Sequence, residues 1–207
     1  MYKRQARIRL TVSIGEGGIV PDPASCGEPT VLVVAGEYQP LPDEVYEKGY
    51  RAIVSSVRRN SQSPVSKMKS LNFLENMLSR QEARTAGVDE AICLNEEGLL
   101  AEASTSNIFL VGDSALKTPG IASGLLPGVT REAVLELAGE LGIITIEDDI
   151  TLEQLLEADE AFLTNSVMEV MPLTEVDGKP IGSGTPGQVT WKLTAAYEEM
   201  VWREVGE

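Results

Sequence analysis

The sequence predicts a globular domain in which strands and helices are mixed, of the α+β or irregular α/β class. Segments typical of strands and of helices follow one another without the strict alternation of a doubly wound fold. The length of 207 residues suits one large domain or two small ones, and 43% hydrophobic with 24% charged residues is an ordinary globular composition. The chain is therefore long enough to bury a substantial core.

Alternating or β-branched apolar residues predict the strands. These strands are expected at residues 6–14, 30–35, 51–57, 91–95, 99–103, 108–111, 161–164 and 170–176. Residues 15–29 are rich in glycine and proline and are expected to form a loop. Residues 1–5 (MYKRQ) are charged and unpatterned, and we expect them to be a non-native start, so that the domain spans residues 6–207.

Apolar residues that recur with the helical period predict the helices. These helices are expected at residues 70–86, 131–141, 152–157 and 188–203. Gly87 is expected to end the first of them, and the Thr151 hydroxyl is expected to cap the third. In the first helix the apolar residues at helical spacing are Leu71, Leu74, Leu78 and Ala83.

The charge balance narrows the classes of partner. The chain carries 17 Lys and Arg against 32 Asp and Glu, a net charge of 17 − 32 = −15. Because a protein that neutralises phosphates needs a basic face, this charge argues against nucleic acid or an anionic membrane as a partner. No apolar run reaches the roughly 20 residues of a membrane span, and Cys26 and Cys93 form no motif. A cytoplasmic protein is therefore expected.

The chain has no histidine, so it lacks the commonest general base at neutral pH and the commonest metal ligand. Ser-His-Asp and Cys-His sites, HExxH helices and His-bearing zinc fingers are thereby excluded within this chain, and we expect no metal site. Catalysis must then use lysine, carboxylate, hydroxyl or tyrosine groups, or a cofactor.

Two segments offer candidate catalytic side chains. Lys67 and Lys69 lie just before the first expected helix and would share a face if that segment is extended. A lysine amine is a nucleophile only when its pKa is lowered or when it is held as a Schiff base. Glu102 lies between apolar residues on an expected strand, where a carboxylate can keep a ring nitrogen protonated by accepting its hydrogen bond. The alternatives are solvated lysines at a helix entrance and a surface strand before a polar turn.

Two further segments suit an anion. Residues 124–131 (GLLPGVTR) form a Gly/Pro turn before a helix, whose free N–H groups suit phosphate, and Thr130 adds a hydroxyl. This segment lacks the spacing of a P-loop or a GxGxxG turn. Residues 163–172 (LTNSVMEVMP) end a strand with small polar side chains that suit the same purpose. Simple helix capping and an ordinary strand-to-loop turn are the alternatives.

Taken together and in this order, the four segments resemble those of the fold-type IV pyridoxal-phosphate enzymes. That family includes branched-chain and D-amino-acid aminotransferases and aminodeoxychorismate lyase. The matching motifs are KSLNFLENMLSRQEA from Lys69, the E-x-S-x-S-N-x-F run at 102–109, LPGVTR at 126–131 and LTNSVMEVMPL at 163–173. The resemblance runs from about Arg7 to the C-terminus. It implies the family's large α+β domain, a mixed sheet or pseudo-barrel with surrounding helices, and pyridoxal 5'-phosphate as cofactor.

The resemblance also implies a role for each matching position. Lys69 matches the lysine that forms the internal aldimine and shuttles the Cα proton, whereas Lys67 does not occupy that position. Glu102 matches the carboxylate that pairs with the pyridine nitrogen. Leu126 matches the residue that packs on the ring face. Val129 and Thr130 match the phosphate cradle, and Asn165 and Ser166 match the second phosphate strand. Arg9 and Val167 match the substrate pocket.

The activity that the resemblance implies is transamination between an amino acid, branched-chain or apolar, and a 2-oxo acid, in a homodimer. Arg9 sits where branched-chain enzymes have an arginine linked to recognition of the substrate carboxylate, and a guanidinium suits a carboxylate; an exposed strand residue is the alternative. TNSVMEVMP is more similar to the lyase, so pyruvate release from aminodeoxychorismate is a second hypothesis. The family's small N-terminal domain has no counterpart in the sequence, which predicts a truncated chain. An inactive fragment is therefore a third hypothesis.

Overall fold

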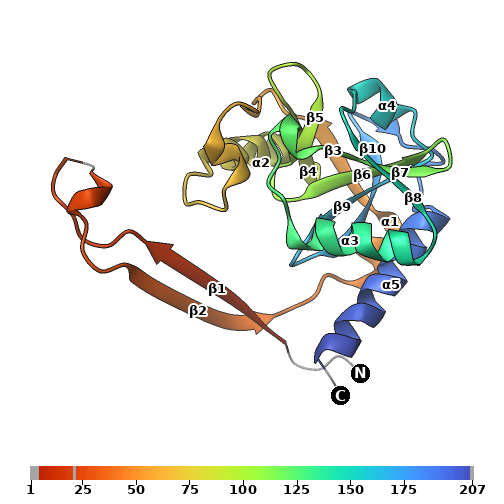
Figure 1. Ribbon diagram of the computed structural model, residues 1–207. Coiled ribbons are helices and arrows are strands. Elements are labelled where there is room, and N and C mark those ends of the chain that lie inside the picture. Colours follow the sequence, from red (N-terminus) through yellow and green to blue (C-terminus); the bar gives the residue numbers. More distant parts are fainter. Residues whose placement is uncertain (1–4, 21, 206–207) are drawn as a thin grey trace. The chain divides into compact units, whose positions relative to one another are not determined.

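The computed structural model describes residues 5–20 and 22–205 (Figure 1). The chain divides into two compact units, residues 1–41 and residues 42–207. Of the segment expected to be a non-native start, residues 1–4 lie outside the described residues, and Gln5 begins the first strand.

The smaller unit is a β-hairpin. Strands β1 (Gln5–Ser13) and β2 (Thr30–Tyr38) pair antiparallel along their full length, which confirms the two predicted strands. The connection between them contains the short 3-10 helix η1 (Pro23–Ser25), as the predicted glycine- and proline-rich loop allows. The apolar side chains of one face are exposed within this unit: Ile8, Leu10, Val12, Val31 and Val33.

The larger unit is built on a mixed nine-stranded sheet that curls on itself (Figure 1). Its strand order is β5-β4-β3-β10-β9-β6-β7-β8, and β11 pairs with β10. The pairs β3–β4, β3–β10 and β7–β8 are parallel and the others are antiparallel. β5 also contacts β6 and β7, which are distant from it along the sheet. This curled mixed sheet confirms the predicted α+β class.

The strands of this sheet have the following bounds: β3 Tyr50–Val54, β4 Glu90–Leu94, β5 Leu100–Ala103, β6 Asn107–Gly112, β7 Ala115–Pro119, β8 Ile144–Asp148, β9 Glu160–Asn165, β10 Glu169–Val176 and β11 Lys179–Pro180. The helices are α1 Asp43–Lys48, α2 Leu74–Ala86, α3 Val129–Glu140, α4 Leu152–Leu156 and α5 Gln188–Val205, with the 3-10 helices η2 Pro64–Lys67 and η3 Ile121–Ser123. Thr151 caps α4 through a capping box, as predicted.

The main core lies where helices α3 and α5 pack on strands β6, β9 and β10. Its centre is the stacked pair Phe109 and Phe162, on neighbouring strands, with ring centroids 4.9 Å apart. Val134 and Leu137 from α3 and Leu193 from α5 close over the rings. Burial of such side chains is the dominant stabilising contribution, so this core fixes β9, whose end reaches the site.

Several sequence expectations need correction. The helix expected over residues 70–86 begins at Leu74, because residues before it form turns in which the Ser70 hydroxyl accepts the Asn72 N–H. Its buried face carries Ser79 and Ala83, whereas the other three apolar residues at helical spacing are exposed: Leu71, Leu74 and Leu78. The strand expected over residues 51–57 ends at Val54. Helix α1 and strands β7, β8 and β11 were not expected.

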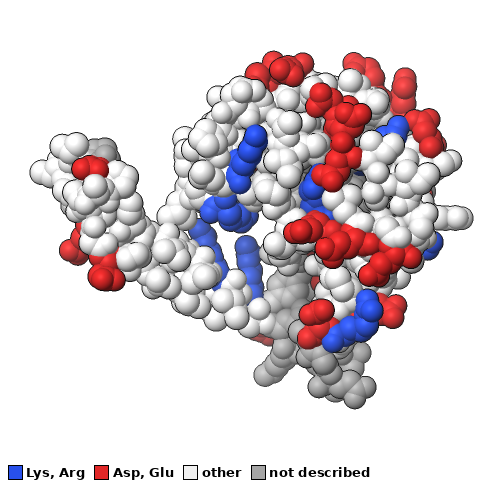
Figure 2. All heavy atoms as spheres, viewed as in Figure 1, with Lys and Arg blue, Asp and Glu red and all other residues white. Residues whose placement is uncertain are grey.

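Acidic residues dominate part of the surface. On the face shown in Figure 2, Asp and Glu side chains gather over the region of α3, β8 and α4. No helix among residues 5–20 and 22–205 is both long and apolar enough to cross a bilayer.

Candidate active site

A cavity of about 570 Å³ lies in the larger unit. It is lined by the segment after β3, the approach to α2, the end of β5, the start of α3 and the end of β9. Segments far apart in the sequence therefore meet in one place. All the residues assigned to cofactor binding line this cavity: Lys69, Glu102, Leu126, Val129, Thr130, Asn165 and Ser166.

The two candidate lysines do not share a face. Lys67 ends the 3-10 helix η2, where the Met68 N–H donates to the Val65 carbonyl at 3.1 Å, and Met68 itself is extended. This turn separates the two side chains, because alternation of faces requires a fully extended strand. Lys69 lines the cavity, and Lys67 is not among its lining residues.

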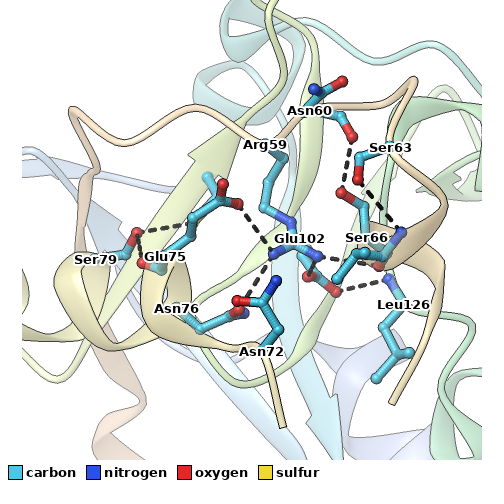
Figure 3. Close-up of polar contacts among 12 residues, drawn as sticks. Arg59, Asn60, Ser63, Ser66, Asn72, Glu75, Asn76, Ser79, Glu102 and Leu126 are labelled. Atoms are coloured by element: carbon cyan, nitrogen blue, oxygen red, sulfur yellow. Dashed lines mark hydrogen bonds and ion pairs between the residues drawn. The ribbon is translucent and has the colours of Figure 1, made fainter. Parts of the chain in front are cut away.

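Glu102 lies on β5, is buried and lines the cavity. Figure 3 shows its side chain between those of Arg59 and Leu126. Its Oε1 forms an ion pair with Nη2 of Arg59 at 2.9 Å. Its Oε2 accepts the main-chain N–H of Leu126, also at 2.9 Å. The alternative of a surface strand before a polar turn is therefore wrong. The carboxylate is held by one side-chain donor, from Arg59, and one main-chain donor, from Leu126.

Burial raises the pKa of Glu102 to about 7. The opposing influences are smaller: the Arg59 charge, then the Leu126 N–H, the Lys69 charge and Asn76 all lower the pKa. The proton of this carboxyl is consequently gained or lost near neutral pH. A cationic group brought into the cavity would favour the charged form.

This raised pKa predicts a measurable pH dependence of stability. The ordinary pKa is 4.5, so the folded chain binds the Glu102 proton more tightly than the unfolded chain. The contribution of Glu102 to the free energy of unfolding is present below about pH 4.5 and is lost as the pH rises to about 7, a change of about 3 kcal/mol.

Urea denaturation of the cofactor-free chain at about pH 5 and about pH 8 measures this loss, with Glu102→Gln as the comparison because glutamine does not titrate. We expect the unfolding free energy of the parent to fall by about 2–3 kcal/mol more than that of the variant between the two pH values. An equal pH dependence in the two proteins would contradict the raised pKa.

The turn before α3 is fixed by contacts with its own surroundings. Gly124 has φ of 90°, and a Cβ there would lie 2.8 Å from Ser61 Cα. Asn107 donates through Nδ2 to the Leu126 carbonyl at 2.8 Å, and a Cβ at Gly128 would lie only 2.2 Å from Asn107 Oδ1. The positive φ and the close backbone therefore require glycine at 124, whereas a side chain at 128 would have to displace the Asn107 amide; the turn presents the first residues of α3 to the cavity.

At the end of β9, Asn165 shapes the next turn. Its Oδ1 accepts the N–H groups of Val167 at 2.8 Å and Met168 at 2.9 Å, and its Nδ2 donates to the Thr105 carbonyl at 3.1 Å. The amide side chain is therefore engaged within the protein. The turn begins beside the cavity, which Asn165 and Ser166 line.

Several buried hydroxyl groups along the cavity have no hydrogen-bond partner within the described residues: Ser106, Thr130 and Thr164. Buried polar groups in native proteins are almost always paired, and a few unpaired ones require an explanation. Thr130 lies in the first turn of α3, where Gly128 is the N-cap and makes no side-chain hydrogen bond. Hydroxyl groups and free helix N–H groups together suit an anionic ligand.

Two predicted substrate residues are not among the residues that line the cavity. Arg9 is an exposed residue of β1, opposite Val34, and belongs to the hairpin unit. Val167 lies in the turn after β9, is 39% exposed and is not among the residues that line the cavity. The roles of both residues toward a substrate stay predictions.

The sequence did not indicate the residues that hold Glu102. Arg59, the Leu126 N–H and Asn76 come from three separate segments; Asn76 and Leu126 lie within motifs but not in this role, and Arg59 lies in none of the motifs. An arginine between strand and turn is usually a solvent-facing residue, so only its burial in the folded chain reveals its role.

The profile of the family described as amino-transferase class IV matches residues 1–176. The chain belongs to this family. The putative branched-chain-amino-acid aminotransferase of Methanocaldococcus jannaschii is 40% identical over 198 residues, which cover 95% of this chain and 68% of that protein. The aminodeoxychorismate lyase of Bacillus subtilis (strain 168) is 33% identical over 204 residues, which cover 98% of this chain and 68% of that protein.

Solved structures of branched-chain aminotransferases share this fold. The Escherichia coli enzyme has a TM-score of 0.87 and 34% identity, covering 94% of this chain and 64% of that one. The Thermoproteus uzoniensis enzyme with norvaline has a TM-score of 0.86 and 36% identity, covering 95% of this chain and 64% of that one. Other branched-chain amino acid aminotransferase structures contain pyridoxamine 5'-phosphate or N-(5'-phosphopyridoxyl)-L-glutamate. This chain spans about two thirds of the length of the relatives it matches.

The residues along the cavity fit pyridoxal phosphate, the cofactor of this family. Such a group needs an amine for covalent attachment, an acceptor for its ring nitrogen and donors for its phosphate. Lys69 and Glu102 are the candidates for the first two, and Glu102 retains acceptor capacity because a carboxylate has about four lone-pair sites. The Thr130 hydroxyl at the start of α3 has no hydrogen-bond partner among the described residues, so it is available as a donor to the phosphate.

Proposed function

We propose that this chain catalyses pyridoxal-phosphate-dependent transamination between an amino acid, branched-chain or apolar, and a 2-oxo acid. The observation that carries the proposal is the presence of Lys69, the buried Glu102 and the unpaired Thr130 hydroxyl along one cavity. The 40% identity to the archaeal putative branched-chain-amino-acid aminotransferase supports the choice of substrate class.

The cofactor, when bound, supplies an electron sink that stabilises negative charge at the substrate Cα. Lys69 would provide the amine that holds the cofactor. When free, the Lys69 amine would take the proton from the substrate Cα and later give it back, which is general acid–base catalysis by one group. Glu102 would hold the proton on the ring nitrogen, because its carboxylate is buried and lines the cavity.

The remaining residues bind and orient. Thr130 and the first N–H groups of α3 would hold the phosphate, together with Ser166 at the end of β9. The Leu126 side chain, half-buried beside Glu102, would pack against one face of the ring. Arg9 and Val167 are proposed to contact the substrate, and a homodimer is proposed as the working form.

Aminodeoxychorismate lyase activity is the second candidate. The 33% identity to the Bacillus subtilis lyase over 98% of this chain favours it. The same lysine and carboxylate would serve both reactions, because each begins with removal of a proton from a carbon attached to the cofactor. The two candidates therefore differ in the substrate pocket and not in the residues that hold the cofactor.

Two assays of the chain with pyridoxal phosphate separate the candidates. We expect leucine or valine with 2-oxoglutarate to yield glutamate and the branched 2-oxo acid, with no pyruvate released from aminodeoxychorismate. Pyruvate release without any amino acceptor would establish the lyase and contradict the transaminase. Absence of turnover in both assays would contradict both candidates.

A further inference from the structure

Arg59 is buried beside the cavity in a segment that the motifs do not cover. It follows β3, and its main chain forms a parallel bridge to Asn95 and donates to the Leu94 carbonyl at 2.9 Å. The side chain is 7% exposed, which is unusual for arginine unless the charge is paired. Its backbone is therefore fixed by the sheet, and its guanidinium points inward toward Glu102 (Figure 3).

The guanidinium is held on several sides. Nη2 forms the ion pair with Glu102 Oε1 at 2.9 Å and also donates to the Ser66 carbonyl at 3.1 Å. Nη1 donates to Asn76 Oδ1 at 3.2 Å and lies 3.7 Å from Glu75 Oε2. Because the guanidinium is planar, contacts with η2, α2 and β5 together fix its orientation.

The same arrangement fixes the segment that carries Glu102. Asn76 accepts from Arg59 and donates through Nδ2 to the Ser104 carbonyl at 3.0 Å, just beyond Glu102. Ser104 and Thr105 in turn donate to the buried carboxylate of Glu90. With Oε1 held by Arg59 and Oε2 held by the Leu126 N–H, the Glu102 carboxylate has one orientation toward the cavity.

We propose that Arg59 is a positioning residue, which keeps the Glu102 carboxylate charged and oriented toward the ring nitrogen of the cofactor. The inference rests on the proposed function, because the ring nitrogen is the partner of Glu102. Arg59 does not need to touch the cofactor, since its ion pair with Oε1 acts through Glu102. Opposite charge at this distance favours the ionised carboxylate, and removal of one partner from a buried ion pair leaves the other uncompensated.

Three other titratable groups face Glu102 or Arg59. Lys69, before α2, also lowers the pKa of Glu102, and Glu75 on α2 lies near Arg59. Cys93 on β4 is opposite Glu102 in the sheet register, and burial raises the pKa of its thiol to about 11, so the thiol is neutral near pH 7. Arg59 is therefore the fixed cation that Glu102 contacts whether or not Lys69 is attached to a cofactor.

The test compares Arg59→Gln with Arg58→Gln, a neighbouring exposed arginine that donates to the Ser55 carbonyl. In the cofactor-free chain, carbon-13 NMR follows titration of the Glu102 carboxyl, identified by its absence in Glu102→Gln. We expect Arg59→Gln to raise the midpoint by about 1–3 pH units and Arg58→Gln to leave it unchanged. Arg59→Lys restores the charge and should return the midpoint most of the way to the parent value.

Nitrogen-15-labelled pyridoxal phosphate then reports the ring nitrogen directly. We expect a protonated ring nitrogen near pH 7.5 in the parent, Arg58→Gln and Arg59→Lys, and a deprotonated one in Arg59→Gln. Circular dichroism checks that each variant is folded. If Arg59→Gln is not folded, the comparison with the parent is made with Arg59→Lys. An unchanged Glu102 midpoint or an unchanged ring nitrogen in Arg59→Gln would overturn the proposal. If the Glu102 midpoint shifts in Arg59→Gln but the parent binds no cofactor, the result would instead refute the proposed function and, with it, the role of Glu102 toward the ring nitrogen.

Discussion

Replacement of Lys69 by alanine is expected to abolish covalent attachment of pyridoxal phosphate and to lower the transamination rate by at least about 10²–10⁴-fold. Lys69 is the lysine that lines the cavity close enough to Glu102 to lower its pKa. The chain has no histidine that could replace its amine as a base. The expected loss is therefore that of both the attachment point and the group that moves the Cα proton.

The measurement is a visible spectrum after addition of pyridoxal phosphate, followed by borohydride reduction and peptide mass spectrometry. In the parent we expect a yellow species and a reduced cofactor fixed on the peptide that contains Lys69. Lys67→Ala is the matched control, because Lys67 is two residues away and does not line the cavity. Equal colour and equal labelling in parent and Lys69→Ala, or loss of both in Lys67→Ala, would contradict the assignment.

Short motifs led to a prediction that Lys69, Glu102 and the segment 126–130 belong to one site. The fold brings these residues to one cavity, and their roles there stay predictions. The sequence could not predict the contacts that hold these residues in place. The ion pair of Glu102 with Arg59 and its hydrogen bond from the Leu126 N–H both join residues that are distant in the chain. Such pairs depend on the strand order, which no local pattern encodes.

The errors in the secondary structure have a similar origin. Apolar residues at helical spacing predicted the helix before residue 86, yet Leu74 and Leu78 are exposed and Ser79 is buried against Ser55 and Cys93. Periodicity indicates that a helix has an apolar face, but the neighbouring elements decide which face is covered. Strand β8 was not predicted: its alternation of apolar and polar residues is confined to 144–147, and all of its residues are exposed at the sheet edge.

Replacement of Glu102 by glutamine is expected to lower the transamination kcat by about 10²–10³-fold, the usual effect of removing one preorganised polar group. Glutamine has nearly the same shape but no charge, so it cannot hold a proton on the ring nitrogen. Its NH2 group would also face either the Arg59 guanidinium or the Leu126 N–H, both of which are donors. The variant would thus lose the charge and also the arrangement in which both carboxylate oxygens accept.

The kinetic pattern separates this role from a general loss of structure. Since Glu102 is proposed to contact the ring and not the amino acid, we expect kcat to fall while KM for the amino acid changes little. Glu132→Gln, in the first turn of α3 and exposed, is the control with the same chemical change and should retain the parent kcat. Full recovery of Glu102→Gln by excess pyridoxal phosphate would show that the residue only strengthens cofactor binding, and would contradict its assignment to the ring nitrogen.

In the parent, the activity should fall on the acid side as the Glu102 carboxylate gains its proton, and this acid limb should be missing from the variant.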